Sequence, residues 1–170
     1  GMISTIPSMI FNTLGAYMLG ADLDLLLEQG KIGGAELATV ALVAPIVEEF
    51  FKPLGLLLIF RRLESGYTGV LYGVTCGMGF ALVENMSYEL LVLIGEDVDT
   101  VWTATSFVRG VGSTLLHAVG PALVGYFMAC ARFKGCDRHL VVGAYLMAIA
   151  LHASWNTAAT LGLLFPEVDV

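Results

Sequence analysis

Long uninterrupted runs of apolar residues dominate this chain, with short polar connections between them. Four runs stand out, at about residues 37–60, 67–94, 104–131 and 139–165. Each exceeds the roughly 20 residues that an α-helix needs to cross the hydrocarbon core of a membrane. A shorter apolar stretch, residues 3–20, is a candidate for a fifth helix that either crosses the membrane or lies at its surface. The pattern therefore predicts an all-α fold, a polytopic transmembrane helix bundle with four clear spans and this N-terminal helix in addition.

The composition is that of a membrane protein rather than a soluble one. Hydrophobic residues make up 57% of the chain and charged residues 14%. A soluble domain is closer to half apolar and a quarter charged. We expect a single integral-membrane domain over residues 2–170, in contact with the lipid bilayer. The basic residues form no stripe that could follow a phosphate backbone, so no nucleic-acid partner is expected.

The charged residues outside the apolar runs predict the orientation of the chain. Five of the eight lysine and arginine residues lie in the connections 61–66 and 132–138, which alternating spans place on one side. Acidic residues dominate the segments 20–36 and 95–100 and the C-terminal tail, which fall on the other side. Basic loops stay in the cytoplasm. We therefore expect the loops 61–66 and 132–138 to be cytoplasmic and the C-terminus to lie on the outer side.

The three cysteines, Cys76, Cys130 and Cys136, show no CxxC spacing. In the expected topology Cys130 and Cys136 lie at or near the cytoplasmic face, where thiols stay reduced. Neither a disulfide framework nor a thiolate metal site is therefore expected.

The stretch VEEFFKPLG, residues 47–55, places charged residues inside an apolar run. Ionisable side chains within a span are costly and by default indicate function. Every predicted span carries at least one near its middle, and together they are Glu48, Glu49, Glu84, His117 and His152. Because a helix rises about 1.5 Å per residue, these side chains fall in one layer near the membrane midplane. A single histidine in a span often serves packing through an interhelical hydrogen bond, but packing alone explains the whole layer poorly.

Helical spacing predicts which of these side chains meet. Lys52 follows Glu48 by four residues and Glu49 by three, so it can pair with either carboxylate. Such pairing is the usual way to accommodate charges in a medium of low dielectric constant, and it leaves one glutamate for other work. His152 and Asn156 are one helical turn apart and project to the same side.

Prolines and glycines within the spans predict helix kinks and close helix contacts. Pro53 and Pro121 each clash with the carbonyl four residues back, which belongs to Glu49 and His117 respectively. Freed carbonyls of this kind are typical of helices that line a wet cavity, although ordinary kinks are the alternative. Small residues recur at every fourth position of the second span, at Gly69, Gly73, Gly77 and Ala81, and predict close approach of a neighbouring helix.

Carboxylates, imidazoles, an amide and an ammonium that converge in a buried site suit hydrolysis. A desolvated glutamate can take a proton from water, an imidazole can donate one to a leaving amine, and an amide can stabilise an oxyanion. Two histidines and a glutamate, here His117, His152 and Glu84, are also a ligand set of zinc hydrolases. The HExxH motif is absent. The residue types therefore leave both versions open, one without a cofactor and one with a divalent metal such as zinc.

Four short motifs make the chain resemble the PrsW family of intramembrane proteases, which is related to the CAAX-processing and bacteriocin-processing membrane peptidases. They are EEFFK (Glu48, Glu49, Lys52), FALVEN (Phe80, Glu84), the single mid-span His117, and HASWN (His152, Asn156). These motifs occur in the family's order, each on its own span. A departure is that the family usually carries further helices ahead of the first motif, whereas here residues 2–36 precede it.

The resemblance implies an intramembrane protease that cleaves a membrane-anchored protein or peptide substrate. By the match, Glu48 or Glu49 would activate water, and Glu84, His117 and His152 would complete the catalytic set. Asn156 would support the oxyanion or orient His152. Metal dependence remains open in the resemblance as well.

Two other classes of protein compete with a protease. A transporter or ligand-binding protein could use the buried Glu, Lys and His residues as a proton or ion pathway. Such a protein usually has two pseudo-symmetric halves, and the sequence shows no repeat. A haem protein with His117 and His152 as axial ligands would leave the three glutamates unexplained.

Overall fold

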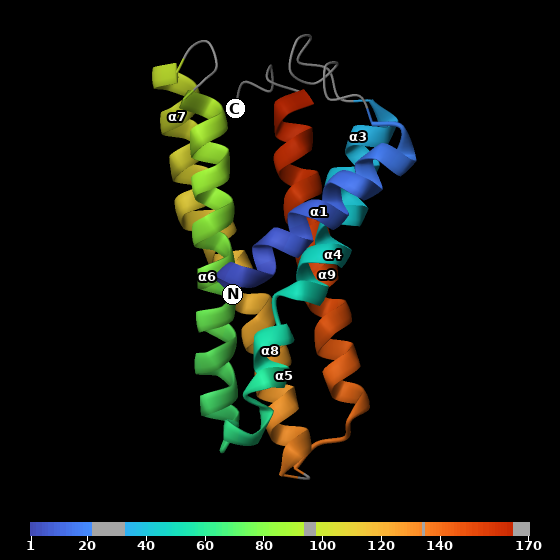
Figure 1. The fold of residues 1–170 in the computed structure, drawn as a ribbon, viewed down its shortest axis with the longest axis vertical. Helices are drawn as coiled ribbons and strands as arrows, with labels where there is room; N and C mark the ends of the chain where they lie inside the picture. The colour runs from blue at the N-terminus through green and yellow to red at the C-terminus, as the bar shows by residue number, and fades with distance from the viewer. Residues whose placement is uncertain (22–32, 94–97, 134, 165–170) are drawn as a thin grey trace.

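The computed structural model describes residues 1–21, 33–93, 98–133 and 135–164, and within these residues all regular structure is helical. Figure 1 shows an elongated bundle. In chain order the elements are α1 (Met2–Leu19), α3 (Gly34–Ala38), the π-helix η1 (Thr39–Val43), α4 (Ala44–Phe51), α5 (Leu54–Leu58), the 3₁₀ turn η2 (Phe60–Arg62), α6 (Gly66–Leu93), α7 (Val98–Phe107), the π-helix η3 (Val108–Ser113), α8 (Thr114–Arg132) and α9 (His139–Leu164). The predicted all-α bundle is confirmed.

Within the described residues, four helical segments are long and apolar enough to cross a membrane. They are Met2–Leu19, Gly66–Leu93, Thr105–Arg132 and His139–Thr160. Three of them correspond to the predicted spans 67–94, 104–131 and 139–165, up to residue 164 where the description ends. The first is the N-terminal candidate, which forms a helix of 18 residues.

The predicted span 37–60 is not one continuous helix. It consists of short helical pieces, and α4 ends at Phe51 while α5 begins at Leu54. Pro53 causes this break, because its ring cannot donate a backbone hydrogen bond and clashes with the carbonyl of the preceding turn. Broken helices occur at membrane depth where protein surrounds them or where they line a cavity. Lys52, between the two helices at this break, is completely buried.

The glycine ridge of α6 packs closely on α8. A Cβ atom added to Gly69, Gly73 or Gly77 would overlap the backbone of α8. The carbonyl oxygens met in this way belong to Gly125, Pro121 and His117, again four residues apart. Close approach of a second backbone at this ridge is therefore confirmed, and it fixes His117 against α6. The His117 carbonyl, which Pro121 removes from normal helical bonding, lies over Gly77.

α1 crosses the bundle diagonally, from its middle to the upper end in Figure 1. Gly1, which caps its N-terminus, lies against Cys76 and Gly79 of α6, and further along Phe11 packs on Phe51 of α4 with ring centroids 5.5 Å apart. α1 therefore touches both helices that carry predicted site glutamates.

The described residues place the two basic connections at one end of the bundle. The start of α6, the end of α8 and the start of α9 meet at the lower end in Figure 1, next to the basic connections 61–66 and 132–138. The acidic segments lie mostly outside the described residues, as residues 22–32, 94–97 and 165–170 do. The side of the membrane on which each end lies stays a prediction.

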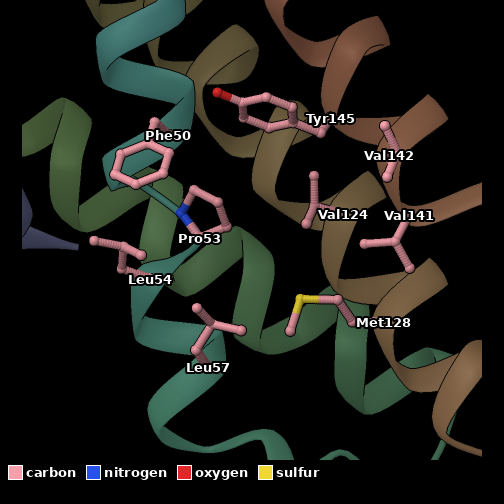
Figure 2. A pocket seen from close by; sticks show the side chains of 9 residues that line it. All are labelled: Phe50, Pro53, Leu54, Leu57, Val124, Met128, Val141, Val142 and Tyr145. Atoms are coloured by element: carbon pink, nitrogen blue, oxygen red, sulfur yellow. The ribbon is translucent and has the colours of Figure 1, made fainter. Parts of the chain in front are cut away.

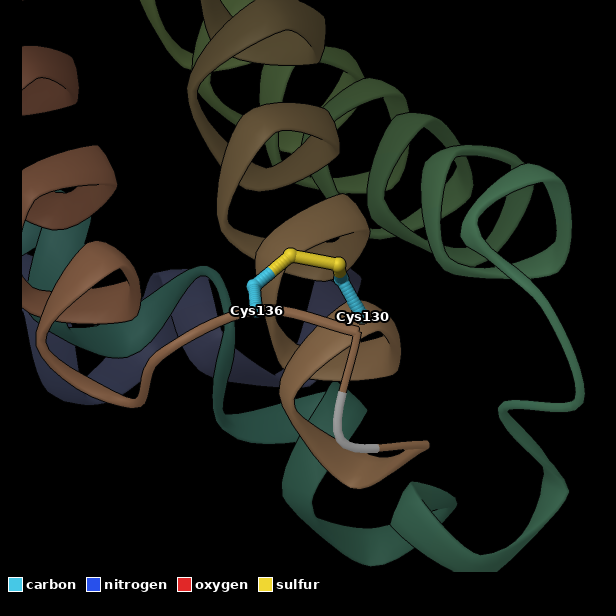
Figure 3. Close-up of a disulfide and its surroundings, with 2 residues drawn as sticks. All are labelled: Cys130 and Cys136. Atoms are coloured by element: carbon cyan, nitrogen blue, oxygen red, sulfur yellow. A yellow bond between two sulfur atoms is a disulfide. The ribbon is translucent and has the colours of Figure 1, made fainter.

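A disulfide joins Cys130, near the end of α8, to Cys136 in the connection to α9 (Figure 3), with the Cα atoms 5.3 Å apart. The expectation of reduced thiols at this position was wrong for the structure. The reason is local geometry, since the chain reverses direction within six residues and brings the two side chains together. Cys76 is a free cysteine.

Candidate active site

Lys52 is the centre of a buried cluster of charges. Its Nζ lies 2.6 Å from Glu49 Oε1 and 3.5 Å from Glu48 Oε2. Lys52 is 0% exposed, Glu48 4% and Glu49 2%. Helical spacing predicted that Lys52 could pair with either carboxylate; it pairs with both, and more closely with Glu49. The Nζ also lies 4.8 Å from the centroid of the Phe80 ring, whose face attracts a cation.

His152 reaches this cluster from α9. Its Nδ1 lies 3.0 Å from Glu49 Oε1, and its Nε2 lies 3.7 Å from Glu48 Oε2. Lys52 Nζ, which can only donate, lies 3.3 Å from the same Nδ1. The contact with Glu49 is shorter, and because an ionised carboxylate oxygen can only accept, it favours the ring proton on Nδ1. Nε2 of the neutral ring is then an unprotonated nitrogen that faces Glu48.

His117 enters from α8 with the opposite ring nitrogen turned inward. Its Nε2 lies 2.7 Å from Glu84 Oε2, so this nitrogen carries the proton. Its Nδ1 is buried and has no hydrogen-bond partner among the described residues. The rings of His117 and His152 meet edge to face, with centroids 5.2 Å apart.

The atoms without partners point to a ligand site. Glu48 Oε2, like His117 Nδ1, is buried without a hydrogen-bond partner in the described part of the chain. Leaving such groups unpaired is costly, so a partner is expected. Glu48, His117 and His152 can each offer one ligand atom, and these atoms lie within 4.8 Å of one another. Two imidazole nitrogens and a carboxylate oxygen fit the donor types that zinc prefers.

This set differs from the one that the residue types indicated. Glu48 takes the place expected for Glu84, and Glu84 lies behind His117 instead. Each imidazole thus donates to a carboxylate on its outer side, His152 to Glu49 and His117 to Glu84. In metal sites such carboxylates fix the tautomer and the orientation of the ligating ring.

Asn156 lies elsewhere. Its Nδ2 donates to the carbonyl of Val40 in η1, 3.0 Å away, and so ties α9 to the π-helix ahead of α4. The contact that orients His152 comes from Glu49. The other predicted residues, Glu48, Glu49, Lys52, Glu84, His117 and His152, come together.

Three residues that contact the cluster were not among the site residues predicted from the sequence. Asn12 Nδ2 donates to Glu48 Oε1 over 3.1 Å, and Arg109 Nη2 lies 2.6 Å from Glu84 Oε2. Gly120 leaves room for Glu49, because a Cβ there would overlap Glu49 Oε2. The position of Arg109 inside an apolar run could have indicated a role at the site. Asn12 is indicated more weakly, by the alignment of Thr5, Ser8 and Asn12 on one face of an otherwise apolar helix.

An apolar cavity of about 290 Å³ lies beside the break between α4 and α5 (Figure 2). It is lined by Phe50, Pro53, Leu54, Leu57, Val124, Met128, Val141, Val142 and Tyr145. Phe50 and Pro53 directly adjoin Glu49 and Lys52 in the chain, so the cavity and the charged cluster share one helical segment.

The chain matches the model of the PrsW family, described as intramembrane metalloproteases, over residues 1–168. It belongs to the PrsW family. Protease PrsW of Bacillus subtilis (strain 168) is 28% identical over 140 residues, 79% of this chain and 60% of that protein. Protease PrsW of Oceanobacillus iheyensis is 25% identical over 115 residues, 65% of this chain and 49% of that protein. No solved structure matches the chain.

Family membership and the apolar helices together identify an integral membrane protein. The chain spans about half to three fifths of the length of these PrsW proteins. The motif residues of the predicted resemblance, from Glu48 to Asn156, all fall within the region that the PrsW family model covers.

Proposed function

We propose that this chain hydrolyses peptide bonds of membrane-associated proteins, with water activated at the cluster of Glu48, Glu49, His117 and His152. The observation that carries the proposal is that two buried atoms without hydrogen-bond partners among the described residues, Glu48 Oε2 and His117 Nδ1, converge beside His152. Membership in a family described as intramembrane metalloproteases supports the same conclusion.

Glu48, His117 and His152 would hold a divalent metal such as zinc. When bound, the metal polarises the scissile carbonyl and lowers the cost of forming a nucleophile from water. Glu49 and Glu84 would keep the two imidazoles turned toward it, each by accepting a ring proton on the outer side.

Glu49 is the residue that we assign to proton transfer. Its Oε1 is engaged by Lys52 and His152, and its Oε2 occupies the space left by the missing Cβ of Gly120. The oxygen of water bonds to the carbonyl carbon while Glu49 takes the water proton. The proton then passes to the amine nitrogen as the carbon–nitrogen bond breaks.

Mass spectrometry of new peptide termini tests this function even though the substrate is unidentified. Membranes would contain the wild-type chain, Glu49→Gln, or Gly143→Ala as a matched control in the open helical surface of α9. We expect termini within or beside the spans of other proteins with wild type and Gly143→Ala, and their loss with Glu49→Gln. If membranes with and without the wild-type chain contained the same set of peptide termini, protease activity would be rejected and an ion pathway favoured.

A further inference from the structure

Arg109 is a charged residue inside the span Thr105–Arg132. A guanidinium at this depth is costly unless it is paired, and it is only 18% exposed. Its Nη2 lies 2.6 Å from Glu84 Oε2, and its Nε donates to Asn85 Oδ1 over 3.2 Å. Its Cζ lies 3.6 Å from the centroid of the Tyr88 ring. All three partners belong to one stretch of α6, so Nε, Nη2 and one face of the guanidinium are matched there.

The backbone around Arg109 is adapted to this position. Arg109 lies in the π-helix η3, a form that is often found at functional sites. Its carbonyl accepts hydrogen bonds from Thr114 Oγ1 at 3.0 Å and from Asn85 Nδ2 at 3.2 Å. Asn85 therefore holds the arginine by its side chain and by its backbone at once.

Glu84 connects the arginine to the cluster, because the same oxygen, Oε2, contacts both Arg109 Nη2 and His117 Nε2. We infer that Arg109 is a positioning residue, which holds the Glu84 carboxylate so that His117 keeps its proton on Nε2 and its bare Nδ1 toward Glu48. The inference deepens the proposed function and rests on it for the role of Nδ1. The two imidazoles are then held in opposite tautomers by different anchors, since Glu49 holds His152.

Nitrogen NMR of the imidazole rings tests this inference in purified, metal-free protein. The chain has three histidines, and the third, His139, has a side chain that is 77% exposed and serves as an internal reference. We expect wild type to show Nε2–H for His117 and Nδ1–H for His152. Arg109→Met should give a mixture of tautomers at His117 and leave His152 unchanged.

Zinc affinity, measured by titration with zinc alone, is the second readout. We expect Arg109→Met to bind zinc at least tenfold more weakly, as is typical when a group behind a ligand is removed. Arg109→Lys should recover part of the affinity, because it keeps the charge beside Glu84 but cannot also bind Asn85. Arg132→Met is the matched control, since it makes the same change at the far end of the same span, where Arg132 binds the carbonyls of Phe60 and Leu63.

An unchanged His117 tautomer together with unchanged zinc affinity in Arg109→Met would overturn the inference. If that variant does not fold, Arg109→Gln, which remains polar but loses the charge, is judged by the same two outcomes. Wild type that binds no zinc would count against the proposed function, whereas the tautomer of His117 would still decide the role of Arg109.

Discussion

Lys52 and Glu49 form an ion pair 2.6 Å long between side chains that are 0% and 2% exposed. The ammonium also lies 3.5 Å from Glu48, so one cation compensates two carboxylates in the interior. Three charges in a medium of low dielectric constant are tolerated only because they are held together. The ion pair is therefore needed for the stability of the folded protein as well as for the geometry of the site.

We predict that Lys52→Met destabilises the protein by about 3–5 kcal/mol, because it leaves two buried carboxylates without their cation. Denaturation in detergent micelles, followed by circular dichroism, measures the change. The double variant Lys52→Met with Glu49→Gln should recover part of the loss, since one of the orphaned charges is gone. An unfolding midpoint equal to that of wild type would show that Lys52 does not compensate these carboxylates.

We predict that Glu48→Gln and Glu49→Gln both lose proteolytic activity, but for different reasons. Glu48→Gln replaces a proposed ligand oxygen and should lower zinc affinity by about 10-fold or more. Glu49→Gln should retain most of the bound zinc but lose cleavage, because an amide cannot take a proton from water. Metal analysis of the two purified variants beside the cleavage assay separates them. The reverse pattern, with zinc lost only in Glu49→Gln, would exchange the two assigned roles.

We predict that Gly120→Ala impairs the site although it adds a single methyl group. The new Cβ would overlap Glu49 Oε2 and crowd the Cβ of Ala148, so the carboxylate must move. Overpacking of this kind costs about 1–3 kcal/mol, and the displaced Glu49 carboxylate should lower the cleavage rate more than the overpacking lowers stability.

Gly143→Ala on α9 is the control, since no atom lies within 4 Å of its added Cβ. It should be neutral or slightly stabilising, because alanine is the better helix former. Equal cleavage by both variants would mean that Glu49 has room to shift.

We predict that the unfolded, unreduced protein reacts with one maleimide and the reduced protein with three. Cys76 is the free thiol, whereas Cys130 and Cys136 are joined. Mass spectrometry of protein from freshly broken cells, denatured in the presence of the reagent, gives the count. Three maleimides before reduction would instead agree with the cytoplasmic location that the basic loops predict.

Much of the fold could be predicted because local sequence determines it. Apolar runs of this length exclude a soluble fold, and the glycines of α6 at every fourth position have no use except close helix contact, which Gly77 and the His117 carbonyl make. The pairing of Lys52 with Glu48 and Glu49 followed from spacing on one helix turn. Depth along each span was enough to bring Glu84, His117 and His152 into one layer.

Only the tertiary structure determined which side chains on different helices contact one another. Spacing along one helix does not reveal how the helices rotate against one another, so it could not tell that Glu48 rather than Glu84 faces both imidazoles. The same rotation turned Asn156 toward Val40, brought Arg109 behind Glu84, and placed Asn12 against Glu48. Pro53 predicted a kink, whereas the end of α4 at Phe51, the start of α5 at Leu54 and the complete burial of Lys52 between them are known only from the tertiary structure. The residue types of this site were thus encoded locally, whereas their roles arise from packing.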